Sequence, residues 1–81
     1  MLELSESINV WALFEKASVR PFVFIWNNRK IKIETINFVH TTHEGSALIY
    51  HFSVSAGGNF YKLGFDCSNL KWILEAVEDD S

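Results

Sequence analysis

Hydrophobic residues in the first part of the chain recur with the spacing of a helix. Between residues 6 and 17, four of them fall at positions i, i+3, i+4 and i+7: Val10, Leu13, Phe14 and Ala17. These positions form one stripe on a helix surface. Ser5 or Ser7 can cap the helix, and Pro21 ends any continuation because the residue before a proline avoids helical geometry. The pattern predicts an amphipathic helix over about residues 6–17.

From residue 22 onward the hydrophobic spacing changes to two, which is typical of a β-strand. The asparagine pair at 27–28 indicates a two-residue type I′ turn, because asparagine tolerates the positive φ angles that this turn needs. The hairpin so formed places Trp26 opposite Arg29. Lys30 and Lys32 then share the other face of the strand.

Later segments predict further strands. After Ile33 the apolar residues change faces, which indicates either a bulge near Glu34-Thr35 or a strand covered on both faces. A polar turn is predicted at residues 41–45. The alternating segments on either side of the loop 56–59 predict a second hairpin, with three cross-strand pairs on one buried face: Val54 with Tyr61, Phe52 with Leu63, and Tyr50 with Phe65.

The segment 70–77 fits two structures. One is a helix capped by Ser68, because residues 70, 73, 74 and 77 (Leu, Ile, Leu and Val) have helical spacing. The other is a strand, because Trp72, Leu74 and Ala76 alternate. Periodicity leaves both open.

Together these elements predict a single α+β domain over residues 1–81. The N-terminal helix is expected to pack on a strongly bent, barrel-like antiparallel β-meander of about five strands, at about residues 21–77. Twelve aromatic residues supply the dense core that so short a chain needs. The polar residues 78–81 are expected to form a frayed tail.

The charge distribution and the single cysteine indicate the kind of partner and the cellular compartment that suit the domain. Residues 16–71 carry seven basic and three acidic residues, whereas the remainder carries seven acidic residues and no basic one, for a net charge of -3. Such asymmetry suits an anionic partner, although acidic termini also favour solubility.

The N-terminal segment lacks the basic start of a signal peptide, and the longest apolar run, residues 22–26, is too short to span a bilayer. Cys67 has no second cysteine to pair with and is expected to be a buried or half-buried structural cysteine. We expect a reduced, cytoplasmic protein without membrane contact.

The strongest candidate surface is the 26–32 hairpin, which carries three cations and a tryptophan. Nucleobases stack on aromatic rings while lysine and arginine neutralise phosphate. Trp26, Arg29, Lys30 and Lys32 are therefore the predicted nucleic-acid contacts. The alternative interpretation is that Trp26 packs at the edge of the core and that the lysines protect the strand from pairing with another edge.

Catalytic chemistry has no comparable candidate. His40, His43 and Glu44 are ligand types that suit zinc, but they flank a predicted turn instead of lying on a helix. Glu34 and Asp66 lie in no apolar pocket that would raise the pKa of an acid catalyst. The sequence therefore predicts no catalytic residues, no metal site and no cofactor.

The stretch from Pro21 to Val77 carries a series of short motifs: Phe24-Ile25-Trp26, Asn27-Asn28-Arg29, Ile31-Lys32-Ile33, Leu63-Gly64-Phe65-Asp66 and Trp72-Ile73-Leu74-Glu75. In these it resembles a poorly characterised bacterial family of small β-domains, some of them associated with translesion, Y-family-like DNA polymerases. The resemblance implies a strand for residues 71–77 and a DNA-associated accessory role, and it carries no catalytic residues. The chain departs from the family pattern at residues 40–44 and in its helix-like N-terminal segment.

We therefore expect a non-enzymatic binding or interaction module. A protein partner or self-association is expected, through the apolar strip of Val23 and Ile25 or through an uncovered edge strand. Weak binding of single-stranded nucleic acid through the 26–32 hairpin is the first alternative, and a small metal-dependent hydrolase is the second.

Overall fold

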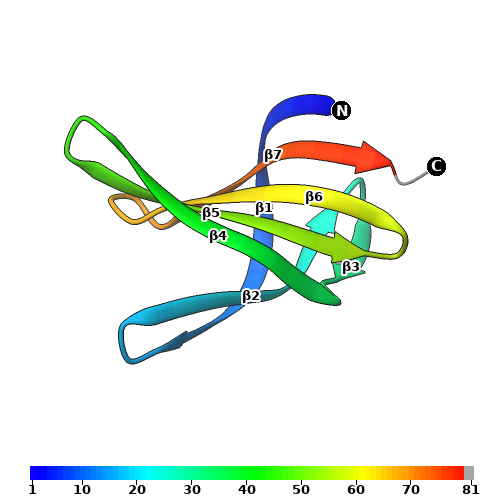
Figure 1. The fold of residues 1–81 in the computed structure, drawn as a ribbon, viewed down its shortest axis with the longest axis horizontal. Helices are drawn as coiled ribbons and strands as arrows, with labels where there is room; N and C mark the ends of the chain where they lie inside the picture. Colours follow the sequence, from blue (N-terminus) through cyan, green and yellow to red (C-terminus); the bar gives the residue numbers. More distant parts are fainter. Residues whose placement is uncertain (80–81) are drawn as a thin grey trace.

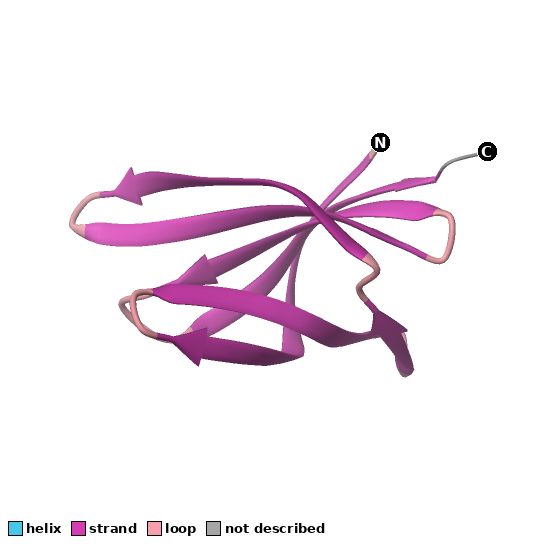
Figure 2. Cartoon of the chain, turned by 60° about the horizontal axis from the view of Figure 1, so that its bottom comes forward, coloured by secondary structure: helices cyan, strands magenta, loops and turns pink. Residues whose placement is uncertain are grey.

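The computed structural model describes residues 1–79, which form seven β-strands and no helix (Figures 1 and 2). The strands are β1 (Leu2–Glu15), β2 (Ser18–Trp26), β3 (Arg29–Lys32), β4 (Thr35–Glu44), β5 (Ala47–Ala56), β6 (Asn59–Asp66) and β7 (Lys71–Asp79). All neighbours pair antiparallel, in the order β3-β2-β1-β7-β6-β5-β4. The domain is all-β, so the predicted α+β class and the count of about five strands are wrong.

The segment predicted as a helix, residues 6–17, lies in β1 and in the turn that follows it. Ile8, Val10 and Ala12 pack partly buried against the core, while the residues between them are exposed. Strand alternation therefore runs through the same segment as the predicted helical stripe, and the two patterns share only Val10. Pairing with β2 and β7 decides between the two, because tertiary packing overrides local spacing.

β1 belongs to two parts of the sheet. Its first half, up to Ile8, pairs with β7, and its second half, from Asn9, pairs with β2. We call β4, β5, β6, β7 and the first half of β1 the large sheet, and the second half of β1 with β2 and β3 the small sheet. Figure 1 shows β1, in blue, running across the direction of β5 and β6 to connect the two.

The sheet curls into a half-barrel because its two end strands, β3 and β4, follow each other in the chain. Only Ile33 and Glu34 connect them. The Ile33 N–H donates to the Phe22 carbonyl of β2 at 2.8 Å, and the Glu34 N–H donates to the Ser55 carbonyl of β5 at 2.9 Å. This link holds both ends of the sheet near each other without a ladder between β3 and β4.

The register of both predicted hairpins is confirmed. β2 and β3 pair Trp26 with Arg29, and the turn asparagines at 27–28 have φ angles of 52° and 61°. β5 and β6 form the three predicted pairs: Val54 with Tyr61, Phe52 with Leu63, and Tyr50 with Phe65.

Three predicted boundaries change. β4 continues to Glu44, so the turn predicted at 41–45 is shorter, and the bulge predicted near 34–35 falls between Ile36 and Phe38. Residues 71–77 form a strand. β7 extends to Asp79, so residues 78–79 are paired and are not a frayed tail, while positions 80–81 lie outside the described residues.

The core lies on the inner face of the half-barrel. Its fully buried hydrophobic side chains are Phe24, Phe52, Val54, Leu63 and Leu74. All of these except Phe24 come from β5, β6 and β7. Phe24 reaches in from β2 and packs edge-on against Tyr61, with ring centroids 5.1 Å apart. Phe24 is thus the fully buried hydrophobic side chain of the small sheet, and partly buried residues such as Val10, Trp26 and Ile31 pack around the core beside it.

Candidate nucleic-acid interface

The β2–β3 hairpin presents its predicted site residues on opposite faces. Trp26 lies on the inner side, where its Nε1 donates to Glu6 Oε2 at 3.1 Å and its ring packs edge-on against a core tyrosine. Arg29 is the ladder partner of Trp26 and shares its face of the hairpin. Lys30 and Lys32 follow Arg29 by one and three residues, so both lie on the other face. The structure therefore separates Trp26 from the lysines.

The aromatic side chain beside the lysines is Trp11 of β1. Its ring is 50% exposed, and the Lys30 Nζ lies 5.4 Å from the ring centroid. Trp11 pairs with Val23, which pairs in turn with Lys32. Both lysines therefore share the outer face of the small sheet with Trp11. Trp11 was not among the predicted contacts because the hydrophobic spacing around it predicts a helix, away from the hairpin.

A second cation–aromatic pair lies further along β2. The Arg20 Cζ lies 5.4 Å from the centroid of the ring of Phe22, a residue that is 41% exposed. The β1–β2 register shifts between Trp11 and Ala12, so Phe22 has no partner on β1, and its carbonyl accepts from the Ile33 N–H. We call the following five residues the basic aromatic face: Trp11, Leu13, Arg20, Lys30 and Lys32.

The small sheet and the rest of the chain carry net charges of opposite sign. Residues 9–32, which make up the small sheet and its turns, carry five basic residues and one acidic residue, a net charge of +4. The remainder of the chain carries two basic and nine acidic residues, a net charge of -7. The small sheet is therefore a locally positive surface on an acidic protein.

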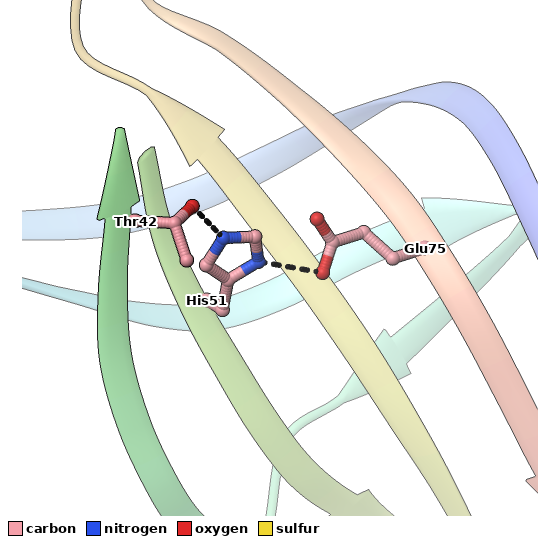
Figure 3. A network of polar contacts seen from close by, with 3 residues as sticks. All are labelled: Thr42, His51 and Glu75. Carbon is pink, nitrogen blue, oxygen red and sulfur yellow. Dashed lines mark hydrogen bonds and ion pairs between the residues drawn. The ribbon is translucent and has the colours of Figure 1, made fainter. Parts of the chain in front are cut away.

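A polar chain of three residues lies on the outer face of the large sheet (Figure 3). Thr42 Oγ1 lies 2.7 Å from His51 Nε2, and His51 Nδ1 lies 3.0 Å from Glu75 Oε1. These residues come from β4, β5 and β7, so the chain crosses over β6 at Gly64. A Cβ atom at Gly64 would lie 2.6 Å from Glu75 Oε2, so the missing side chain makes room for the carboxylate.

The order of hydroxyl, imidazole and carboxylate is that of the Ser-His-Asp hydrolases. A hydrolase also needs a substrate pocket beside its nucleophile. The adjoining groove, of about 340 Å³, is lined by His51 and Glu75 but not by Thr42. The Thr42 hydroxyl thus lies outside the groove that His51 and Glu75 line. We interpret the three residues as a link between strands β4, β5 and β7.

The residues considered as metal ligands do not converge. His40 stacks on His51, with ring centroids 4.7 Å apart. His43 lies three positions further along β4, and so on the opposite face of the strand. Glu44 lines the groove beside Glu75. Within residues 1–79, no three His, Cys, Asp or Glu side chains lie close enough together to hold a metal ion.

The turn between β6 and β7 is fixed by Asp66. Its Oδ1 accepts hydrogen bonds from the Ser68 hydroxyl at 2.6 Å and from the Ser68 backbone N–H at 2.8 Å. These bonds favour the charged form and lower the pKa of the Asp66 carboxyl. Cys67 is exposed in this turn, so the prediction that it is buried or half-buried is wrong.

Comparison of the chain with protein-family models, with curated proteins and with solved structures finds no match. The resemblance to the polymerase-associated β-domains therefore rests on its sequence motifs alone. None of the described residues belongs to a helix long and apolar enough to cross a membrane. Function has to be argued from the surfaces of this molecule.

Proposed function

We propose that this domain is a non-enzymatic binding module and that its basic aromatic face binds single-stranded nucleic acid. The observation that carries the proposal is the half-exposed Trp11 ring with the Lys30 ammonium 5.4 Å from its centroid. Stacking and phosphate neutralisation are the two interactions that single-strand binding needs, and this pair supplies both.

The exposed rings supply the stacking. Base stacking on an aromatic ring contributes about 1–3 kcal/mol and tolerates any base. A lysine over an exposed ring contributes only about 0.5–1 kcal/mol, so a base can displace Lys30 from Trp11. The displaced ammonium group is then free to meet a phosphate. Phe22, 41% exposed beside Arg20, offers a second ring.

The cations supply the phosphate contacts. Lys30 and Lys32 lie two residues apart on one face of β3, a spacing of roughly 6.6–6.8 Å that is close to one phosphate step of an extended strand. Arg20 extends the positive charge along β2. Because these contacts displace counterions, binding should weaken steeply as salt rises.

Sequence preference is expected to be small. Side chains that read base edges approach them on an element that enters a groove, and the basic aromatic face is a short curved sheet. Stacking and phosphate contacts are indifferent to base identity. The proposed ligand is therefore single-stranded DNA or RNA of any sequence, bound weakly.

The proposal is tested by fluorescence titration of labelled oligothymidylate and oligouridylate at low salt. The Lys30→Glu/Lys32→Glu variant should bind at least about tenfold more weakly, because two phosphate contacts become repulsive. The matched control is Lys62→Glu/Lys71→Glu, which changes the net charge equally but on the large sheet. The control should lose much less affinity.

Two results would overturn the proposal. One is no binding at about 100 μM protein, where a weak nonspecific site is detectable. The other is an equal loss of affinity in both double variants, because net charge alone would then explain binding. Either result leaves a protein partner as the function of the module.

A further inference from the structure

The two end strands of the sheet differ in how they resist pairing with another strand. β3 has four residues, of which Arg29, Lys30 and Lys32 are cationic. β4 has ten residues, is exposed along almost its whole length, and carries only one charge, on Glu44 at its end. Lysines, prolines and short length are the usual protections of an edge strand, and β4 has none of them.

Hydrogen bonds on β5 show which backbone groups of β4 face outward. The Leu48 carbonyl accepts from Cys67 on the β6 side, and the Ser55 carbonyl accepts from Glu34 on the β4 side. Because backbone groups alternate along a strand, His51 directs its groups to β4, where its partner is His40. The residues of β4 that direct their N–H and C=O groups to the free edge are therefore Val39, Thr41 and His43.

We propose that β4 is a self-association edge, and that it pairs antiparallel with β4 of a second copy about a two-fold axis at Thr41. This register uses the straight segment from Phe38 to Glu44, because the bulge between Ile36 and Phe38 bends the strand before it. Thr41 lies opposite Thr41 of the second copy, and Val39 lies opposite His43. The outward groups then form about six backbone hydrogen bonds across the axis.

The charge of β4 and its extended conformation both favour a second copy of the chain as the strand that pairs with it. In this register the two Glu44 carboxylates lie at opposite ends of the ladder, about six residues or roughly 20 Å apart, so like charges do not meet. Threonine pairs directly opposite each other are favourable on a sheet. A second copy presents the strand already extended on β5, so it loses less conformational entropy on binding than a disordered peptide.

The experiment is sedimentation equilibrium of the whole chain between about 10 μM and about 1 mM, the range in which a small, polar interface associates. Wild type should approach the mass of two chains. Thr41→Lys places two ammonium groups against each other and should hold the mass at one chain. Thr41→Pro removes an N–H that faces away from β5, so it should also give one chain without loss of fold. Ser7→Lys, on exposed β1, is the matched control and should associate like wild type.

Amide hydrogen exchange on wild type locates the interface even if a variant fails to fold. The amides of Val39, Thr41 and His43 should become protected as the protein concentration rises. A mass of one chain at every concentration would overturn the proposal. So would a dimer in which these three amides exchange freely, because association would then use another surface such as the Val23 and Ile25 strip.

Discussion

The large sheet and the small sheet differ in which side chains they bury. The large sheet buries nearly the whole core through β5, β6 and β7, and its outer face carries the polar chain of Thr42, His51 and Glu75. The small sheet buries Phe24 and Pro21 but leaves Trp11 and Phe22 half exposed beside cations. The proposed binding face therefore lies on other strands than most of the core. Substitutions on one sheet should affect one property and spare the other.

The largest effect should come from the core of the large sheet. Phe52→Ala should lower the free energy of unfolding by about 3–5 kcal/mol, because it removes a fully buried ring and leaves a cavity. Phe22→Ala, on the small sheet, should cost about 1 kcal/mol because its ring is already half exposed. Urea denaturation measures both. Similar losses would mean that the two sheets share the core equally.

The second effect should appear in binding and not in stability. Trp11→Ala should weaken single-strand binding by about 1–3 kcal/mol, or about 5–150-fold, through the loss of one stacking ring. Trp26→Phe is the control, since Trp26 packs inward and its indole hydrogen-bonds Glu6. Its affinity should stay near that of wild type. An equal loss in the two variants would place the ligand on the inner side of the hairpin.

A smaller effect is expected at the polar chain of the large sheet. Gly64→Ala should displace the Glu75 carboxylate, break its hydrogen bond to His51 and cost about 1 kcal/mol. In a Glu75→Ala background the same substitution should cost almost nothing. A double-mutant cycle by thermal unfolding measures this coupling. Additive costs would show that alanine at position 64 strains something other than Glu75.

The smallest effect should be a pH dependence from Asp66. Its hydrogen bonds with Ser68 lower the folded-state pKa below the ordinary 3.8, so the folded state favours the carboxylate. This stabilisation is complete above the unfolded-state pKa and is lost as the pH falls through the folded-state value. The urea midpoints of wild type and Asp66→Asn should therefore differ at about pH 6 and converge near pH 2. A gap that persists at the acidic end would contradict this assignment.

The hairpins could be predicted from sequence because each one closes locally. Asparagine or glycine at a short turn fixes the register, and the apolar faces then match across the pair. The course of β1 could not be predicted in this way. Its partners are β2 and β7, and Leu2 pairs with Val77 at the other end of the chain. Local spacing at Val10, Leu13 and Phe14 fits a helix equally well, and only distant pairing excludes it.

The candidate site could likewise be predicted only where it depends on the local register of the hairpin. Lys30 and Lys32 were grouped on one face because the hairpin register places them there. Trp11 joins them from a strand whose alignment was not visible in the sequence. The inward position of Trp26 does follow from its alternation with Phe24, and this was the signal for its packing against the core.

β1 has a consequence for how the molecule opens. None of the side chains of β1 is fully buried, yet β1 is the strand that joins the small sheet to β7 of the large sheet. Local opening needs less free energy where few apolar contacts are broken. Opening of the small sheet would break the packing of Phe24 and Pro21 but leave the contacts among β5, β6 and β7 intact, so the amides of the small sheet should exchange before those of β5, β6 and β7. A ligand on the basic aromatic face would suppress this local opening by mass action, and would slow exchange in the small sheet before it slowed exchange in the core.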